Sequence, residues 1–329
     1  MKVLVYSAKP FEMPLLNNAN HGVQNLSFTT NRLSLATAAM AEGFEAISIF
    51  SADDASAEVL QALSNFGVSY MTLRSVGHDN VATDTAAKLN IRVANVPSYS
   101  PNAIAEHAIS ILLAFNRNII RAQRQSLQHN FLLDNLIGFD LYQKTVGILG
   151  TGKIGSVLAR ILHGFGCNIL AHDLHKDEDL IHSFGVAYVS HRSICEQAKL
   201  IFVCLPLTEE TKHLINTSYI QQLQKKPILV NIGRGAIVDT VAVLQGLDQE
   251  LLEGYVTDVY ENEHGIFFYD HSHEDIHDKL LHQLLCHPKV LLTPHQGFAT
   301  QEALTNIAES TISNLNAWSA GARAANEIT

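Results

Sequence analysis

The N-terminal hundred residues alternate short apolar runs with longer stretches of helical periodicity. A short apolar run is typical of a buried strand, and apolar positions recurring every three or four residues are typical of an amphipathic helix. Strands interleaved with helices predict a parallel α/β sheet. The expected strands are residues 3–6, 46–49, 71–73 and 93–96, and the expected helices are 32–41, 57–66 and 84–89.

The pattern changes at Pro101. Residues 103–124 form one long helical stretch that is apolar on most faces, including Ile109, Leu112 and Ile119, and such a helix is expected to be buried. A second α/β series then begins at Thr145 and ends in a helical stretch. Its expected strands are 145–149, 169–172, 201–204, 228–231, 255–258 and 290–293, and its expected helices include 156–162 and 301–317.

Length and charge narrow the possible classes. A chain of 329 residues exceeds the usual size of one hydrophobic core, so two domains are expected. The 22 Lys and Arg against 32 Asp and Glu give a net charge of -10, which disfavours a nucleic-acid or anionic-membrane surface. A small anionic substrate held by one arginine remains compatible with that balance.

The four cysteines and the apolar runs predict a cytoplasmic protein without a membrane span. Cys167, Cys195, Cys204 and Cys286 are widely scattered and form no C-x-x-C, as expected of reduced core thiols. The first apolar run is too short for a signal peptide, and no run is long enough to span a bilayer.

A glycine-rich loop directly after residues 145–149 is the strongest local motif. Gly150, Gly152 and Gly155 form G-x-G-x-x-G before a helical stretch. In dinucleotide-binding folds these glycines allow a tight turn, close approach to a pyrophosphate, and close packing of helix on strand. Asp173 follows Gly155 by 18 residues, near the spacing of an acid that binds the ribose 2′-hydroxyl. The motif favours NAD over NADP; a structural strand–turn–helix is the alternative.

Chemically active side chains also follow later predicted strands. Arg234 lies between two glycines, where its planar guanidinium suits a carboxylate, although an arginine in a surface turn is the alternative. His295 ends another strand, beside the strand that leads into Asp258 and Glu263. Because the carboxyl ends of parallel strands face the ligand crevice, a histidine paired there with a carboxylate suits a proton donor. The chain has 17 histidines, and most are expected to be structural.

A second motif is judged to be a coincidence. His273 and His277 match H-E-x-x-H, the zinc-protease pattern. The segment 269–278 has no apolar helical face and no evident third ligand, so it is expected to be an exposed loop entering a helix. No metal is predicted.

Several segments, in this order, resemble the D-isomer-specific 2-hydroxyacid dehydrogenases, and most closely the fermentative D-lactate dehydrogenases. They are VGHDN at 76–80, NVPSYSPNAIAEHA at 95–108, GILGTGKIG at 147–155, CLPLT at 204–208, NIGRGA at 231–236, DVYENE at 258–263, GIFF at 265–268 and TPHQGF at 293–298. The likeness spans essentially the whole chain. It implies two doubly wound parallel-sheet α/β domains, Rossmann- and flavodoxin-like, with a cleft between them. Residues 1–100 with 298–329 would form the substrate domain, and residues 101–297 the NAD-binding domain.

The resemblance implies a role for each matching position. Arg234 would bind the substrate carboxylate and polarise the carbonyl, His295 would donate the proton, and Glu263 would hold that histidine protonated. The backbone amides of Val76 and Gly77 would add carboxylate contacts. Two aromatic residues would shape the pocket, with ordinary packing as the alternative: Tyr99 and Phe298.

NAD would lie over the glycine-rich loop. The implied cofactor contacts are Gly150, Gly152, Lys153, Ile154, Gly155, Asp173, Leu205, Pro206, Thr211, Ile232, Gly233 and Asp258. The chain departs from the family pattern at Ala82, where an acid is common, and at residues 232–233, where Thr-Ser or similar is common. Neither departure removes a catalytic group.

The resemblance therefore predicts an NAD-dependent D-2-hydroxyacid dehydrogenase, and D-lactate dehydrogenase acting on pyruvate in fermentation is the first expectation. The alternatives are an enzyme for a bulkier 2-keto acid, such as 2-ketoisocaproate or phenylpyruvate, and a non-enzymatic NAD-sensing protein on the same fold. The expected partners are a small 2-keto or 2-hydroxy acid and a second copy of the chain, in a homodimer or homotetramer.

Overall fold

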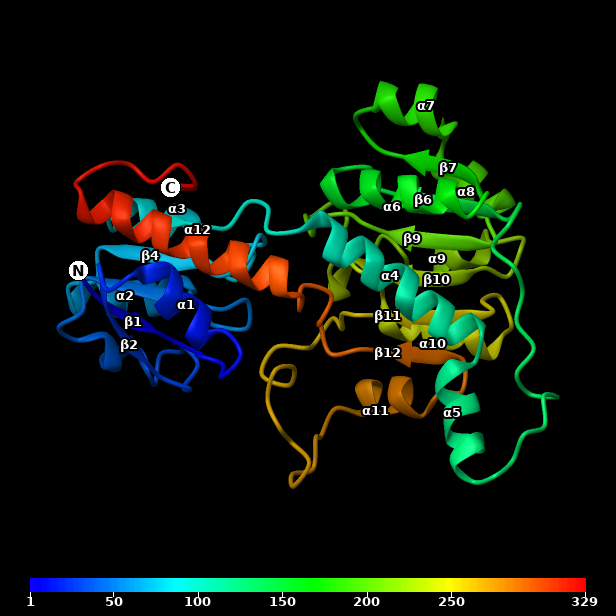
Figure 1. The fold of residues 1–329 in the computed structure, drawn as a ribbon, viewed down its shortest axis with the longest axis horizontal. Coiled ribbons are helices and arrows are strands. Elements are labelled where there is room, and N and C mark those ends of the chain that lie inside the picture. Colours follow the sequence, from blue (N-terminus) through cyan, green and yellow to red (C-terminus); the bar gives the residue numbers. More distant parts are fainter. The chain divides into compact units, whose positions relative to one another are not determined.

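The computed structural model describes all 329 residues, which divide into two compact units. Unit 1 comprises Met1–Ser100 and Phe298–Thr329, and unit 2 comprises Pro101–Gly297 (Figure 1). Each unit is a parallel sheet covered by helices, which confirms the predicted α/β class. None of the helices combines the length and the apolar character that crossing a membrane requires.

Unit 1 is built on five parallel strands in the order β2-β1-β3-β4-β5. The strands are β1 (Lys2–Val5), β2 (Asn25–Phe28), β3 (Ala46–Ile49), β4 (Tyr70–Leu73) and β5 (Arg92–Ala94). The helices are α1 (Met13–Asn20), the 3₁₀ helix η1 (Ala38–Ala41), α2 (Ala57–Asn65), α3 (Thr83–Lys88) and α12 (Gln301–Ser319). Side chains alternate across the sheet, so Leu4 packs in the core beneath α2 while Val3 packs with Trp318 of α12.

Two predictions in unit 1 fail for local reasons. The edge strand β2 and the preceding helix α1 were not predicted, because β2 is only half-buried and carries no apolar run. The helix expected at 32–41 shrinks to η1. The Thr37 hydroxyl donates to the Arg32 carbonyl (2.6 Å) and accepts from the Ser34 N–H (2.9 Å), and these side-chain bonds favour a turn over a helix.

Unit 2 contains seven parallel strands in the order β12-β11-β10-β9-β6-β7-β8. They are β6 (Thr145–Leu149), β7 (Asn168–His172), β8 (Ala187–Tyr188), β9 (Leu200–Val203), β10 (Ile228–Asn231), β11 (Gly254–Thr257) and β12 (Val290–Leu292). The helices are α4 (Pro101–Asn116), α5 (Ile119–Leu127), α6 (Lys153–Gly164), α7 (Glu178–Phe184), α8 (His191–Gln197), α9 (Thr217–Gln221), the 3₁₀ helix η2 (Gly235–Ile237), α10 (Thr240–Asp248) and α11 (Lys279–Cys286). The order reverses between β6 and β9, the switch point at which doubly wound sheets bind ligands.

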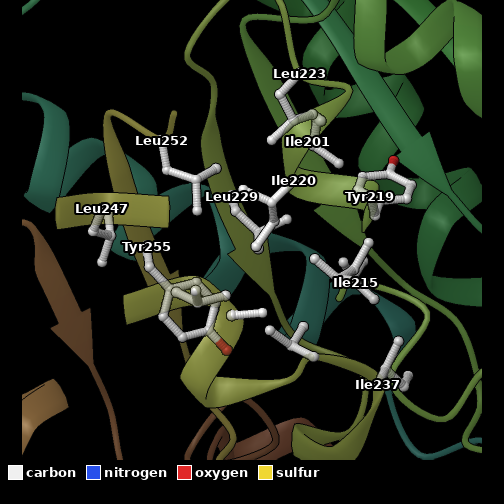
Figure 2. Close-up of a cluster of buried hydrophobic side chains, with 14 of the residues drawn as sticks. Ile201, Ile215, Tyr219, Ile220, Leu223, Leu229, Ile237, Leu247, Leu252 and Tyr255 are labelled. Carbon is white, nitrogen blue, oxygen red and sulfur yellow. The ribbon is translucent and has the colours of Figure 1, made fainter. Parts of the chain in front are cut away.

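Both faces of the unit 2 sheet are buried. On one face α4 and α6 pack side by side over the strands, with Leu112 and Leu158 fully buried (Figure 1). On the other face α8, α9, α10 and α11 cover a second core, in which Ile201, Leu229 and Tyr255 meet residues of the helices (Figure 2). A sheet covered on both faces reads as continuous apolar runs, which is why its central strands were predictable.

The long helix predicted at 103–124 is wrong as a single element. It breaks after Asn116, and Asn118 adopts a left-handed conformation (φ 51°) before α5 begins. The Asn116 side chain donates to the Phe139 carbonyl (2.7 Å) and accepts the Phe139 N–H (3.1 Å). Beyond this break the expected burial also fails, because Ile119 is 55% exposed.

Candidate active site

The glycine-rich loop lies at the switch point of the unit 2 sheet. Gly150 has φ +94°, and a Cβ at Gly155 would lie 2.0 Å from the Gly150 carbonyl oxygen, so neither position accommodates a side chain. A Cβ on Gly152 would meet no protein atom within 4 Å. The loop therefore packs tightly on its inner side and offers open space at Gly152, where α6 begins at Lys153. This is the local geometry that a pyrophosphate requires.

Asp173 follows β7 beside that loop. Its carboxylate accepts hydrogen bonds from the Thr151 N–H (2.6 Å), the Thr151 hydroxyl (3.2 Å) and the His175 N–H (2.9 Å). Burial opposes its charge, but the hydrogen bonds from His175 and Thr151 outweigh burial and lower the pKa of Asp173. The residue is therefore an anion at the position predicted to bind a ribose.

Two further segments predicted to contact the cofactor follow β9 and β10. The Thr211 hydroxyl donates to the Pro206 carbonyl (2.7 Å), so this threonine holds the loop that contains Leu205 and Pro206. A Cβ on Gly233 would lie 2.8 Å from the Leu205 carbonyl oxygen, and Ile232 is buried. The segments after β9 and β10 thus lie against each other, because the two strands are neighbours in the sheet.

His295 and Glu263 form a direct pair after the neighbouring strands β12 and β11. His295 Nδ1 lies 2.6 Å from Glu263 Oε1, and the Tyr260 N–H donates to Glu263 Oε2 at 3.0 Å. Both carboxylate oxygens are therefore engaged. With Nδ1 facing the carboxylate, Nε2 is the ring nitrogen that a ligand can meet. His295 adopts φ 54°, a left-handed conformation that is costly for a non-glycine residue and that clusters at functional sites.

Arg234 follows β10, the strand next to β11. Its guanidinium Nη1 donates to the Gly233 carbonyl (3.1 Å), and the Asn231 side chain donates to the Arg234 carbonyl (3.1 Å). A Cβ on Gly235 would lie 2.0 Å from the carbonyl carbon of Tyr260, so the turn after β10 packs directly on the turn that holds Glu263. The three predicted catalytic residues therefore follow the carboxyl ends of three adjacent strands of one sheet.

Asp258 is 4% exposed, and its carboxylate accepts four hydrogen bonds from the protein. Thr293 Oγ1 (2.6 Å), the Gln296 N–H (2.9 Å) and His107 Nε2 (3.1 Å) contact Oδ1, and the Gly297 N–H (2.8 Å) contacts Oδ2. Burial opposes ionisation, but the bonds from His107 and Thr293 outweigh it and lower the pKa of Asp258. Asp258 was predicted as a cofactor contact, and in this structure it anchors the segment that directly follows His295.

His107 was missed by the sequence analysis. It lies on α4, within 3.1 Å of both Asp258 Oδ1 and Thr293 Oγ1. In the sequence, the only indication of a role for His107 was its place as a single histidine in a largely apolar helical stretch. That signal is weak, because most such histidines only satisfy a buried polar neighbour.

The remaining predicted residues belong to unit 1. Val76 and Gly77 lie in the loop after β4, and Tyr99 and Phe298 form an edge-to-face pair with ring centroids 6.4 Å apart. Phe298 also meets Phe50, at 6.0 Å, which the sequence analysis did not identify. The H-E-x-x-H match, expected to be a coincidence in an exposed loop, lies outside any helix: His273 and His277 are in an exposed segment before α11.

The comparisons with known sequences agree in one family. The sequence model described as "D-isomer specific 2-hydroxyacid dehydrogenase, NAD binding domain" matches residues 109–297. The chain is 42% identical over 323 residues to a 2-hydroxyacid dehydrogenase homolog of Zymomonas mobilis, covering 98% of each chain. It is 39% identical over 329 residues to D-lactate dehydrogenase of Escherichia coli, covering 100% of each.

Solved structures give the same result. The chain is similar to the apo-structure of D-lactate dehydrogenase from Escherichia coli, with a TM-score of 0.90, 38% identity and 100% of both chains covered. It is also similar to D-lactate dehydrogenase from Aquifex aeolicus complexed with NAD and lactic acid, with a TM-score of 0.87, 29% identity, and 97% and 96% of the two chains covered.

Proposed function

The chain belongs to the D-isomer-specific 2-hydroxyacid dehydrogenases, NAD-dependent oxidoreductases of 2-hydroxy acids, and on this premise we propose that it is a D-lactate dehydrogenase that reduces pyruvate with NADH. The observation that carries the proposal is the contact between His295 and Glu263. Both residues, like Arg234, follow the carboxyl ends of adjacent strands. The full-length likeness to a D-lactate dehydrogenase supports the choice of pyruvate.

The nucleotide half of the site fits NAD. The Gly150–Gly155 loop leaves open space at Gly152, and the Asp173 carboxylate, which is anionic, suits a ribose 2′-hydroxyl and repels a 2′-phosphate. When bound, NAD supplies the hydride chemistry. The segments after β9 and β10, which carry Pro206 and Ile232, follow the strands next to β6 in the sheet and would hold a further part of the cofactor.

The catalytic groups divide the work of stabilising charge and moving a proton. Arg234 binds the substrate carboxylate and polarises the carbonyl, because its planar guanidinium can donate two parallel hydrogen bonds. His295 donates a proton from Nε2 to the carbonyl oxygen. Glu263 accepts the Nδ1–H at 2.6 Å and fixes the orientation of the ring. Negative charge that develops on the carbonyl oxygen is thereby met by the guanidinium of Arg234 and by the proton that His295 donates.

The family resemblance assigns further substrate contacts to residues of unit 1. The backbone N–H groups of Val76 and Gly77 bind the substrate carboxylate, and the aromatic group of Tyr99, Phe298 and Phe50 forms the apolar wall. One methylene in such a wall changes affinity by only about 1–3 kcal/mol, so a bulkier 2-keto acid remains the rival substrate.

The test measures NADH oxidation with pyruvate, 2-ketobutyrate, 2-ketoisocaproate and phenylpyruvate, and NAD reduction with D- and L-lactate. Among the four keto acids, pyruvate is expected to have the highest kcat/KM. Of the two lactate isomers, only D-lactate is expected to be oxidised. A higher kcat/KM with a bulky keto acid would replace the proposed substrate, and NADH binding without turnover of any acid would favour the NAD-sensing protein.

Replacing the proton donor tests the mechanism in the same assay. His295→Ala is expected to lower kcat by about 10²–10⁴-fold, the usual contribution of a positioned acid. The matched control is His182→Ala, which removes a histidine that pairs with Glu178 at 3.5 Å on the exposed surface of α7. Equal activity of both variants would refute the role of His295.

We further propose that the chain forms a homo-oligomer through unit 2. The segment from α5 to residue 142 exposes many large apolar side chains, and contiguous exposed apolar surface is typical of an interface. They include Ile119, Leu127, Phe131, Leu132, Leu133, Ile137 and Tyr142, of which Ile137 is 82% exposed. Sedimentation of wild type and of Phe131→Asp/Ile137→Asp tests this: a monomeric wild type would refute it, and dissociation of the variant is expected.

A further inference from the structure

The loop after β4 is held by the segment that follows β5. The Val96 N–H donates to the Ser75 carbonyl (3.0 Å), and the Asn95 side-chain amide donates to the Val76 carbonyl (2.7 Å). Two successive carbonyls of the loop are therefore bound by two successive residues of the neighbouring segment. The Ser75 hydroxyl also donates to the Gly77 carbonyl (2.7 Å), which fixes the next peptide.

These contacts determine where the N–H groups of the loop point. In a trans peptide the carbonyl and the N–H of the same unit point in opposite directions, and the chain has no cis peptide bond. The Val76 N–H therefore points away from Val96, and the Gly77 N–H points away from Asn95. Neither N–H has an acceptor within the protein. Two successive N–H groups on one side of a loop form a concave site for an anion.

Asn95 is itself held by the C-terminal segment. It is 7% exposed; its N–H donates to the Asn326 carbonyl (3.2 Å), and its carbonyl accepts from the Asn314 side chain of α12 (3.1 Å). The Asn326 side chain in turn donates to Asn314 Oδ1 (3.1 Å). The Ile328 N–H donates to the Val93 carbonyl (2.8 Å), so the last residues pair with the edge strand β5. A chain of three asparagines thus connects the C-terminus with the loop.

We propose that Asn95 is a positioning residue for the substrate carboxylate. It binds the Val76 carbonyl and thereby aims the Gly77 N–H at the anion, while Asn314 and Asn326 hold Asn95 in place. This inference rests on the proposed function, which assigns carboxylate binding to the Val76 and Gly77 amides. By this inference, Asn314 and Asn326 contribute to substrate affinity, although neither belongs to the glycine-rich loop or to the proposed catalytic residues.

The test compares two buried asparagines of unit 1. Asn95→Asp keeps size and removes the N–H that holds the Val76 carbonyl, placing a carboxylate oxygen against it. Asn20→Asp is the matched control, because Asn20 is 5% exposed and its side chain also donates to a main-chain carbonyl, that of Gln24 (2.9 Å). Asn326→Ala, which keeps the main-chain bond to Asn95, tests the next step of the connection.

For Asn95→Asp we expect the KM of the best 2-keto acid to rise about 10- to 100-fold, the effect of one misdirected buried hydrogen bond. The kcat and the KM of NADH should stay within about threefold, because the lost contact binds substrate and transition state alike. The dissociation constant of oxamate, titrated against the NADH complex, should rise with KM. Asn326→Ala should shift both constants in the same direction by less, and Asn20→Asp should shift neither.

The outcomes separate this inference from the proposed function. An active wild type with an unchanged KM and oxamate affinity in Asn95→Asp would overturn the role of Asn95 alone. A KM increase of equal size in Asn20→Asp would also overturn it, since any buried lesion would then suffice. A wild type that binds NADH but neither turns over a 2-keto acid nor binds oxamate would overturn both.

Discussion

Glu12→Ala would remove the counter-ion of a guanidinium that has no access to water. The Arg74 side chain is fully buried and that of Glu12 is 6% exposed, with Nε–Oε2 and Nη2–Oε1 distances of 2.9 and 3.1 Å. Arg74 also donates to the Tyr6 carbonyl (2.7 Å) and to the Ser48 hydroxyl (3.0 Å). These two contacts satisfy hydrogen bonds but carry no full negative charge. Removing one partner of such a pair costs about 3–5 kcal/mol.

The expected loss can be read from the fluorescence of the single tryptophan. Trp318 is 2% exposed in α12 and stacks on Tyr70 at 5.1 Å, so its emission reports the unfolding of unit 1. Urea titrations should show the free energy of unfolding of Glu12→Ala lowered by about 3–5 kcal/mol. The control Glu42→Ala, at an exposed position, should stay within about 0.5 kcal/mol of wild type.

A double substitution distinguishes an unpaired charge from lost packing. Glu12→Ala combined with Arg74→Met removes both charges and should recover most of the stability lost in Glu12→Ala, because an apolar pair is often no less stable than a buried ion pair. A loss below about 1 kcal/mol in Glu12→Ala, or no recovery in the double variant, would refute the reasoning.

Three further predictions concern unit 2. Asp173→Ser should lower the preference for NADH over NADPH, measured as the ratio of kcat/KM values, by about tenfold or more, because it removes a charged acceptor; an unchanged ratio would contradict the ribose assignment. Asp258 has a folded pKa below its unfolded value, so its stabilisation is complete above the unfolded pKa of about 3.9 and is lost as pH falls through the folded pKa. Asp258→Asn should accordingly flatten the acid dependence of the thermal midpoint, and an acid dependence equal to that of wild type would count against it. Gly235→Ala should lower kcat/KM at least about 10²-fold, since its Cβ would meet Tyr260 at 2.0 Å and displace the turn that holds Glu263. Gly164→Ala, with no atom within 4 Å of its Cβ, should leave kcat/KM unchanged.

The predictable parts of this protein are those whose signal is local. The central strands of unit 2 are buried on both faces and therefore read as apolar runs, whereas the half-buried edge strand β2 has no such run and was missed. The roles predicted for Arg234, Glu263 and His295 remain proposals, but their placement after three adjacent strands is what the parallel topology requires.

The sequence-based predictions of secondary structure fail where a side chain forms a hydrogen bond with a residue distant in the chain. The helix predicted through residue 124 stops because Asn116 binds the backbone of Phe139, and a Cβ at Gly138 would lie 2.1 Å from the Asn116 carbonyl. The hydrophobic periodicity of the sequence does not predict that contact.

The class of the fold, the glycine-rich loop with Asp173, and the residues proposed to act at strand ends were all predictable from the amino-acid sequence. These depend on burial patterns and on spacings within one strand–turn–helix unit, which a short segment specifies alone. Three contacts appear only in the folded chain: Glu12 neutralises Arg74, Asp258 binds the segment after His295, and Asn95 binds the loop at 75–77. Each of these is a hydrogen bond or ion pair between residues far apart in the chain, and such partners meet only when the chain has folded.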